Sequence, residues 1–145
     1  MICCTLTSAS DKTLRNYIHN HLSDRLFDVL VIDECAQSIE PACWIAIQFA
    51  KKIVLAGDHK QLEATVKSDE ASKRGLSLSL FERVMNFPTA ERFATMLVEQ
   101  YRMNELIMQW SSSQMYNNRL VAHSGVANRF IDDIVPDPSL IQSEL

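Results

Sequence analysis

The segment 27–37, FDVLVIDECAQ, restricts the possible folds of this chain more than any other stretch, because four apolar residues run directly into two carboxylates, Asp33 and Glu34. An unpaired charge inside a domain costs several kcal/mol, which is on the order of the stability of a whole domain. We therefore expect the two acids to lie just beyond the end of a buried strand, to hold a cation, or to do both.

Short apolar runs that favour β-strands alternate along the chain with stretches of helical periodicity. The expected strands cover residues 1–6, 27–32, 51–56 and 93–98, and the expected helices cover residues 14–22, 39–50, 76–85 and 105–116. Strands that alternate with helices predict an α/β fold with a parallel sheet. Residues 67–75 are the best candidate for a loop. From residue 124 onward the pattern weakens, and the tail 133–145 predicts no firm structure.

Composition limits the class of protein without deciding its function. The chain has 145 residues, the length of one domain, and a formal net charge of −4. That charge argues against a generally basic nucleic-acid-binding protein, although a local basic groove is compatible with it. No signal peptide and no apolar run of about 20 residues is found, so we expect a soluble protein of the cytoplasm, the nucleus or both, with no membrane partner.

The four cysteines show neither a CxxC pair nor the spacing of a disulfide framework. Three of them lie in or beside apolar runs. Buried free thiols in a reducing compartment are the expected state of this set, which consists of Cys3, Cys4, Cys35 and Cys43.

Polar residues follow two of the expected strands, at the sheet edge where α/β proteins bind ligands. Asp33 and Glu34 follow the first of these strands, and the segment 55–62, LAGDHKQL, follows the second. Gly57 permits a tight turn, Asp58 can bind a cation-linked water or a neighbouring backbone group, and the Gln61 amide can donate to a phosphate oxygen. The acidic dipeptide alone is more typical of a solvated turn than of a ligand site, so the prediction rests on the two strand ends together.

Four segments in this order resemble the superfamily 1 helicases of the Upf-like branch, and in particular their immunoglobulin mu-binding-protein type. They are VIDECAQSIEP, IVLAGDHKQL, GLSLSLFERV and VEQYRM, within a resemblance that covers residues 2–126. The resemblance implies a RecA-like P-loop NTPase fold, ATP bound between two RecA-like domains, and movement along single-stranded RNA or DNA. It places residues 1–93 in the C-terminal part of the first domain and residues 94–145 at the beginning of the second, so the parallel sheet is expected to be incomplete.

The resemblance also implies a role for each site residue. Asp33, together with Glu34, holds Mg²⁺ as the Walker B pair, and Glu34 is the general base for the attacking water. Gln61 senses the γ-phosphate from the third motif, in which Gly57 and Asp58 also lie near the nucleotide. From the second domain, Arg102 reaches the same phosphate like an arginine finger, and Tyr101 stacks on the adenine. Without the surrounding motif, Tyr101 would be more typical of a half-buried aromatic residue, and Arg102 of a surface cation.

Nucleic-acid contacts are implied at two positions. Thr5 corresponds to a family threonine that meets the phosphate backbone at a strand end, and Lys60 supplies a cation. A strand residue without a ligand is the alternative for Thr5. Glu63 stands where a polyanion is expected to pass and repels phosphate. Further cations that could compensate for it are Lys67, Lys73 and Arg74.

The sequence contains no GxxxxGK[ST] phosphate loop, and the family's final arginine motif is also missing. We therefore expect a fragment of an ATP-dependent helicase that is inactive alone and needs the remainder of the helicase core. The alternative is a non-catalytic module, derived from a helicase, that binds nucleic acid or a partner. An in-frame Walker A upstream of Met1 would favour the fragment, and a genuine start at Met1 would favour the module.

Overall fold

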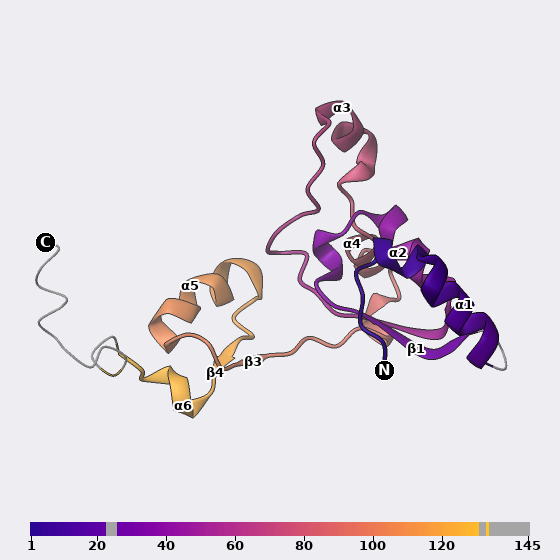
Figure 1. Ribbon diagram of the computed structural model, residues 1–145. Helices are drawn as coiled ribbons and strands as arrows, with labels where there is room; N and C mark the ends of the chain where they lie inside the picture. The colour runs from indigo at the N-terminus through magenta and orange to yellow at the C-terminus, as the bar shows by residue number, and fades with distance from the viewer. Residues whose placement is uncertain (23–25, 131–132, 134–145) are drawn as a thin grey trace, which may run out of the picture. The chain divides into compact units, whose positions relative to one another are not determined.

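The computed structural model describes residues 1–22, 26–130 and 133 of the chain. The chain divides into two compact units, Met1–Ala94 and Thr95–Leu145, here called unit 1 and unit 2. Figure 1 shows the elements of both units along the chain. Within the described part of the chain, no helix has the length and hydrophobicity needed to cross a membrane.

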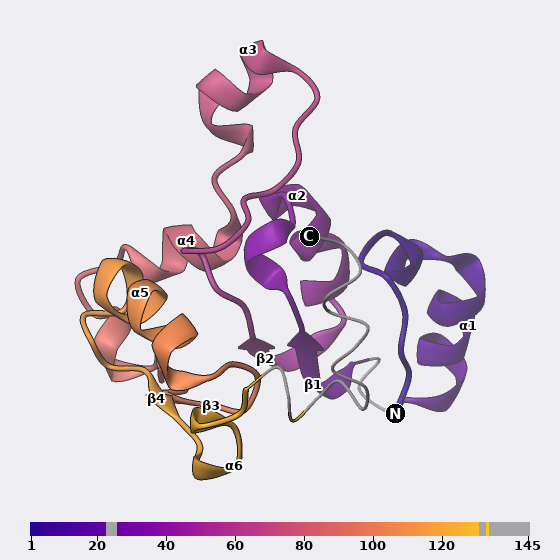
Figure 2. The same cartoon turned by 90° about the vertical axis from the view of Figure 1, so that its left-hand side faces the viewer.

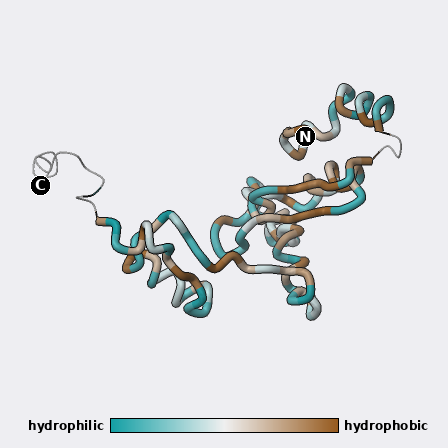
Figure 3. Tube along the Cα trace, turned by 90° about the horizontal axis from the view of Figure 1, so that it is seen from below, coloured by the Kyte–Doolittle hydropathy of each residue, from teal (hydrophilic) through white to brown (hydrophobic). Residues whose placement is uncertain are grey.

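The sheet of unit 1 consists of two parallel strands, β1 (Phe27–Ile32) and β2 (Ala50–Leu55). Their register runs from Phe27 opposite Ala50 to Ile32 opposite Leu55, and Figure 2 shows the two arrows side by side and pointing the same way. Figure 3 shows hydrophobic residues along both strands. The prediction of parallel strands at 27–32 and 51–56 is confirmed to within one residue.

The core of unit 1 lies on one face of this sheet. Ile32 packs with the buried residues Cys35, Cys43 and Leu80, and the partly buried side chains around them are Leu6, Leu30, Ile47, Leu55, Phe81 and Val84. The opposite face leaves Val29, Val31 and Val54 half or more exposed. Because side chains alternate along a strand, a core on one face of the sheet leaves these three valines exposed on the other face.

The predicted helices of unit 1 are confirmed; two of them are shorter than expected, and the first begins two residues earlier. They are α1 (Lys12–His21), α2 (Glu40–Ile47) and α4 (Leu80–Met85). Asp11 caps α1 by accepting from Thr13 N at 2.7 Å, and Ser79 caps α4 by accepting from Glu82 N at 3.1 Å. Gly75, with φ of 95°, precedes α4 and explains why that helix begins later than its hydrophobic pattern, since a left-handed residue interrupts a helix.

The cysteines divide into two pairs. Cys35 and Cys43 are free and fully buried, with their Sγ atoms 3.8 Å apart, and burial raises the pKa of the Cys35 thiol to about 12. Cys3 and Cys4 are free but exposed. The expectation of burial is therefore wrong for Cys3 and Cys4, because their segment has no strand neighbour to cover it.

Two further predictions in unit 1 are wrong. Residues 1–6 form no strand, because no other strand of the described chain pairs with them; they lead instead into the 3₁₀ helix η1 (Thr7–Ser10). Residues 67–75, expected as a loop, contain the short helix α3 (Asp69–Ala71) and the π-helical turn η3 (Ser72–Leu76). Ser68 caps α3, and an ion pair of 2.8 Å joins Arg74 to Glu70 one turn away.

Short 3₁₀ helices connect the larger elements of unit 1. They are η2 (Cys35–Gln37), directly after β1, and η4 (Ala90–Arg92), close to the end of the unit.

Unit 2 contains a second parallel pair, β3 (Glu99–Gln100) and β4 (Val121–Ala122), with helices α5 (Glu105–Met115) and α6 (Ser124–Ala127). The helix predicted at 105–116 is confirmed. The strand predicted at 93–98 is wrong, since pairing starts only where Val121 N donates to Val98 O at 2.8 Å. Strand β4 was not anticipated, and α6 lies where the pattern had weakened. Apart from residue 133, the tail 133–145 lies outside the described residues.

Candidate active site

The two predicted acidic turns lie side by side in unit 1. One follows β1 and begins with Asp33 and Glu34, and the other follows β2 and runs from Gly57 to Gln61. Two backbone hydrogen bonds extend the pairing past the strand ends: Ala56 N donates to Ile32 O at 2.9 Å, and Cys35 N donates to Ala56 O at 2.8 Å. The strand ends therefore hold both turns at one edge of the sheet.

Glu34 adopts a left-handed backbone conformation, with φ of 50° and ψ of 35°. Its backbone N–H donates to Asp33 Oδ1 at 3.0 Å, and its own Oε2 accepts from Gln37 Nε2 at 2.9 Å. Both carboxylates are exposed. A non-glycine residue with positive φ is uncommon and clusters at functional sites, so the turn is a genuine local signal.

Gly57 allows the second turn to approach the first. A Cβ at this position would lie 3.0 Å from Ala36 N and 3.1 Å from Cys35 N, both of them backbone atoms. Among the described glycines, Gly75 has a positive φ and Gly57 does not. Glycine is therefore needed at position 57 because a Cβ would not fit, and not because the backbone requires a left-handed conformation.

Asp58 organises the second turn. Its Oδ1 accepts from Lys60 N at 3.0 Å, and its Oδ2 accepts from Gln61 Nε2 at 2.7 Å. Lys60 and Gln61 are exposed, whereas Asp58 is partly buried. The turn thus fixes the Gln61 amide at the same sheet edge as Asp33 and Glu34.

The donor set at this edge is compatible with Mg²⁺. In the described residues, no cluster of three or more His, Cys, Asp or Glu side chains could hold a metal alone. Mg²⁺ at a nucleotide site does not need one, because it takes one or two carboxylates and completes its shell with phosphate oxygens and water. The exposed oxygens of Asp33 and Glu34 are of the right type and lie on adjacent residues.

Thr5 lies outside this pair of turns. Its Oγ1 donates to Ser8 Oγ at 2.8 Å and accepts from Ser8 N at 3.2 Å, so its hydroxyl supports the turn into η1. The side chain is exposed. The strand end expected at this position is absent, since residues 1–6 form no strand in the described chain.

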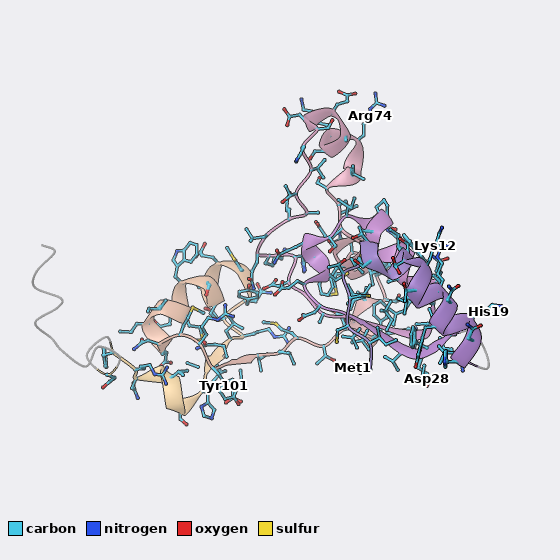
Figure 4. The ribbon with its side chains drawn as sticks, in the orientation of Figure 1. Met1, Lys12, His19, Asp28, Arg74 and Tyr101 are labelled. Atoms are coloured by element: carbon cyan, nitrogen blue, oxygen red, sulfur yellow. The ribbon has the colours of Figure 1, made fainter. Side chains whose placement is uncertain are left out.

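Tyr101 and Arg102 belong to unit 2, where they follow β3, and Figure 4 labels Tyr101. Tyr101 is 61% exposed, and its hydroxyl donates to Glu99 Oε2 at 2.8 Å. The carboxylate of Glu99 raises the pKa of Tyr101 above its usual value. The tyrosine ring stacks on His123, with 4.4 Å between ring centroids. The Arg102 side chain is exposed.

Gln100 shapes the turn that carries these two residues. Its Oε1 accepts from the backbone N of Arg102 at 2.9 Å and of Met103 at 2.7 Å, and its Nε2 donates to Met103 O at 2.7 Å. A single side chain thus replaces the backbone contacts that a longer strand would provide.

Known proteins share these segments. Two family models, each described as an AAA domain, match residues 1–69 and 76–142. The DNA-binding protein SMUBP-2 of Mesocricetus auratus is 43% identical over 127 residues, which are 88% of this chain and 12% of that protein. The DNA polymerase alpha-associated DNA helicase A of Saccharomyces cerevisiae is 38% identical over 141 residues, 92% of this chain and 20% of that helicase.

The chain belongs to the superfamily 1 helicases of the Upf-like branch. An uncharacterised ATP-dependent helicase of Methanocaldococcus jannaschii extends the match to an archaeon, with 43% identity over 115 residues, 79% of this chain and 16% of that helicase. The chain therefore spans between about an eighth and a fifth of the length of these relatives. Membership implies the P-loop NTPase fold, with which the parallel strand pairs are compatible.

Sequence reasoning missed three residues whose contacts support the two units: Glu40, Arg83 and His123. Glu40 accepts two hydrogen bonds of 2.7 Å from Arg83, which joins the start of α2 to α4 across 43 positions, and no local pattern could have found that pair. His123 was findable, because it follows β4 as Tyr101 follows β3, but the two-residue strand β4 gives too weak a signal on its own.

Proposed function

We propose that this chain supplies the hydrolytic and nucleotide-contacting residues of an ATP-dependent helicase that acts on single-stranded RNA or DNA. The observation that carries the proposal is the pairing of the two turns, in which Asp33 and Glu34 lie beside the turn from Gly57 to Gln61, joined by the bond from Cys35 N to Ala56 O. Residues 1–93, which make up unit 1 except for its last residue, are then the C-terminal part of a first RecA-like domain, and residues 94–145 begin a second.

The acidic turn divides the chemistry between its two carboxylates. Asp33 holds Mg²⁺, which when bound offsets the charge of the phosphate oxygens. Glu34 accepts the proton of the attacking water, a general-base contribution of about 10²- to 10⁴-fold. The hydrogen bond from Gln37 holds the Glu34 carboxylate in place while leaving its second oxygen to face the water. As a metal ligand, Glu34 contributes alongside Asp33.

The second turn contacts the nucleotide through Gln61. The Asp58 carboxylate fixes the Gln61 amide, so its carbonyl oxygen and its second N–H can meet a water and the γ-phosphate. Gly57 contributes by letting the two turns approach. Its role at the nucleotide is therefore spatial.

Unit 2 contributes Arg102, which stabilises charge on the transferred phosphoryl group, and Tyr101, which stacks on the adenine. The exposure of both side chains supports these roles, because each can reach a ligand. The exposed Thr5 and Lys60 contact the phosphate backbone of the single strand, while Glu63 weakens that contact.

A chimera tests this function. In the chimera, this chain replaces the matching segment of the yeast DNA helicase A; the match covers 92% of this chain. ATP hydrolysis is measured with and without single-stranded DNA and RNA. Glu34→Gln preserves shape and removes the base, so single-turnover hydrolysis should fall by about 10²-fold or more while ATP still binds with Mg²⁺. Glu91→Gln makes the same chemical change at an exposed position in η4 and should leave hydrolysis unchanged.

Hydrolysis by Glu34→Gln at the parent rate would show that the acidic turn is not the catalytic Walker B pair. A parent chimera that binds single strands but hydrolyses no ATP would favour the alternative, a non-catalytic binding module.

A further inference from the structure

The stacked rings of Tyr101 and His123 occupy equivalent places in unit 2. Strands β3 and β4 are parallel, with Gln100 opposite Ala122, so the residue that follows each strand emerges at the same edge. The bond from His123 N to Gln100 O, at 2.9 Å, extends the pairing by one position. The rings lie with centroids 4.4 Å apart and planes 27° apart.

Each ring is also fixed at its edge by a hydrogen bond. The Tyr101 hydroxyl donates to Glu99 Oε2 at 2.8 Å, and His123 Nδ1 accepts from Gly125 N at 3.1 Å. A Cβ at Gly125 would lie 3.2 Å from that Nδ1 atom, so the backbone closely approaches the imidazole. The stack is thus held from both sides, while Tyr101 remains 61% exposed.

We propose that His123 is a positioning residue for purine recognition: it backs one face of the Tyr101 ring so that the other face is presented to the base of the nucleotide. The inference rests on the proposed function, in which Tyr101 meets the adenine. A ring that is held in place before binding loses less conformational freedom when the base stacks on it. Stacking alone does not distinguish one base from another, so the purine in this proposal comes from the adenine of the proposed function and not from the stack itself.

Two variants separate this role from a structural one. His123 also caps α6 through the bond from Gly125 N. Asn is a good cap without a ring, so His123→Asn keeps the helix start and removes the stacked layer. His123→Phe keeps the stacked layer and removes the acceptor. If His123 is only structural, the Phe variant should weaken base binding more than the Asn variant does. If His123 positions Tyr101, the Asn variant should weaken base binding more.

The experiment uses the whole 145-residue chain with isotope-labelled tyrosine, and AMP and ribose 5-phosphate as probes. The ring resonances of Tyr101 are followed by NMR as each probe is added. AMP should shift them and ribose 5-phosphate, which lacks the base, should not. His123→Asn should reduce the initial slope of the AMP response by about 3-fold or more, as expected from the loss of one aromatic pair. His123→Phe should restore the parent slope.

Unit 1 offers an internal control. Tyr17 stacks on His21 within α1, with centroids 4.6 Å apart and planes 13° apart, so the same pair of rings stands within a helix and not directly after two paired strands. AMP should shift Tyr101 more than Tyr17, and His21→Asn should leave the Tyr101 response unchanged.

Equal AMP responses at Tyr101 and Tyr17, or an unchanged Tyr101 response in His123→Asn, would overturn the role of His123. Failure of the proposed function is distinguishable from this result. It would appear in the chimera as ATP hydrolysis that survives Glu34→Gln, whatever AMP does at Tyr101.

Discussion

The two units place functional turns after a pair of parallel strands, but they hold these turns by different means. In unit 1, β1 and β2 share five register positions, and backbone bonds extend the pairing to Cys35 and Ala56. In unit 2, β3 and β4 share two positions, and the side chain of Gln100 makes three hydrogen bonds within the turn. The turns of unit 1 therefore depend on backbone pairing and on the space at Gly57, whereas the turn that carries Tyr101 and Arg102 depends on the side chain of Gln100.

The largest expected difference between the units lies in catalysis, tested in the chimera. Arg102→Ala, in unit 2, should lower single-turnover hydrolysis by about 10³-fold, the lower end for arginine fingers in GTPases, with little loss of ATP affinity. Asp33→Asn, in unit 1, should instead weaken the Mg²⁺-dependent part of ATP binding, because it removes a charge from the metal's shell. Calorimetry and rapid-quench hydrolysis in the same preparations measure both quantities. A loss of affinity without loss of rate in Arg102→Ala would contradict the finger role.

The next largest difference is expected in the free energy of unfolding when a methyl group is added at a glycine in each unit. Gly57→Ala forces a Cβ against two backbone nitrogens and should lower the free energy of unfolding of unit 1 by about 1–3 kcal/mol. Gly125→Ala meets a histidine side chain at 3.2 Å, which can shift, so its cost in unit 2 should stay below about 1 kcal/mol. Urea unfolding followed by tryptophan fluorescence separates the units, since Trp44 lies in unit 1 and Trp110 in unit 2. Equal costs would show that backbone space does not distinguish the turns.

The response to acid should be smaller and confined to unit 1. Hydrogen bonds from Arg83 hold the pKa of Glu40 below its usual value. A carboxyl whose pKa is lowered by folding stabilises the folded state above its unfolded pKa, about 4.3 for glutamate, and loses that contribution as the pH falls through the folded value. Glu40→Gln should flatten the acid limb of the Trp44 unfolding profile. An unchanged limb would mean that the ion pair does not contribute.

The response of Tyr101 to alkali should be the smallest effect, and it reports on unit 2. The hydrogen bond to Glu99 raises the pKa of Tyr101, so its contribution to stability is present below the unfolded tyrosine pKa, about 10, and is lost as the pH rises through the folded value. Glu99→Gln should lower the Tyr101 midpoint in an ultraviolet titration. A Tyr101 midpoint that stays in place would remove Glu99 as the cause.

Local patterns predicted the parts of the fold that local physics decides. The strands at 27–32 and 51–56 are apolar enough to require burial, and capping residues such as Ser79 mark the helices. The segments 1–6 and 93–98 have the same apolar character, yet a strand exists only where a partner offers hydrogen bonds, and sequence does not show the partner. The polar composition of residues 67–75 did not predict a helix, because such a composition is typical both of a loop and of a solvated helix with an ion pair such as Glu70–Arg74.

The grouping of the candidate site residues at one sheet edge was predictable, but the contacts that support them were not. Asp33, Glu34 and Gln61 follow strand ends, so the parallel register alone brings them to one edge. The lack of room for a Cβ at Gly57 and the ion pair between Glu40 and Arg83 depend on contacts between segments far apart in the chain. Those contacts are properties of packing, which no single stretch of sequence contains.

The left-handed backbone of Glu34 places the demands of stability and of the proposed catalysis in conflict at one position. A side chain other than glycine in this conformation costs on the order of 1 kcal/mol, and asparagine tolerates it better than glutamate does. Selection for thermal stability alone would therefore replace Glu34 by Gly or Asn, and each replacement would discard the proposed base. A glutamate at a position that penalises it is what selection for the proposed turnover, rather than for stability, would leave.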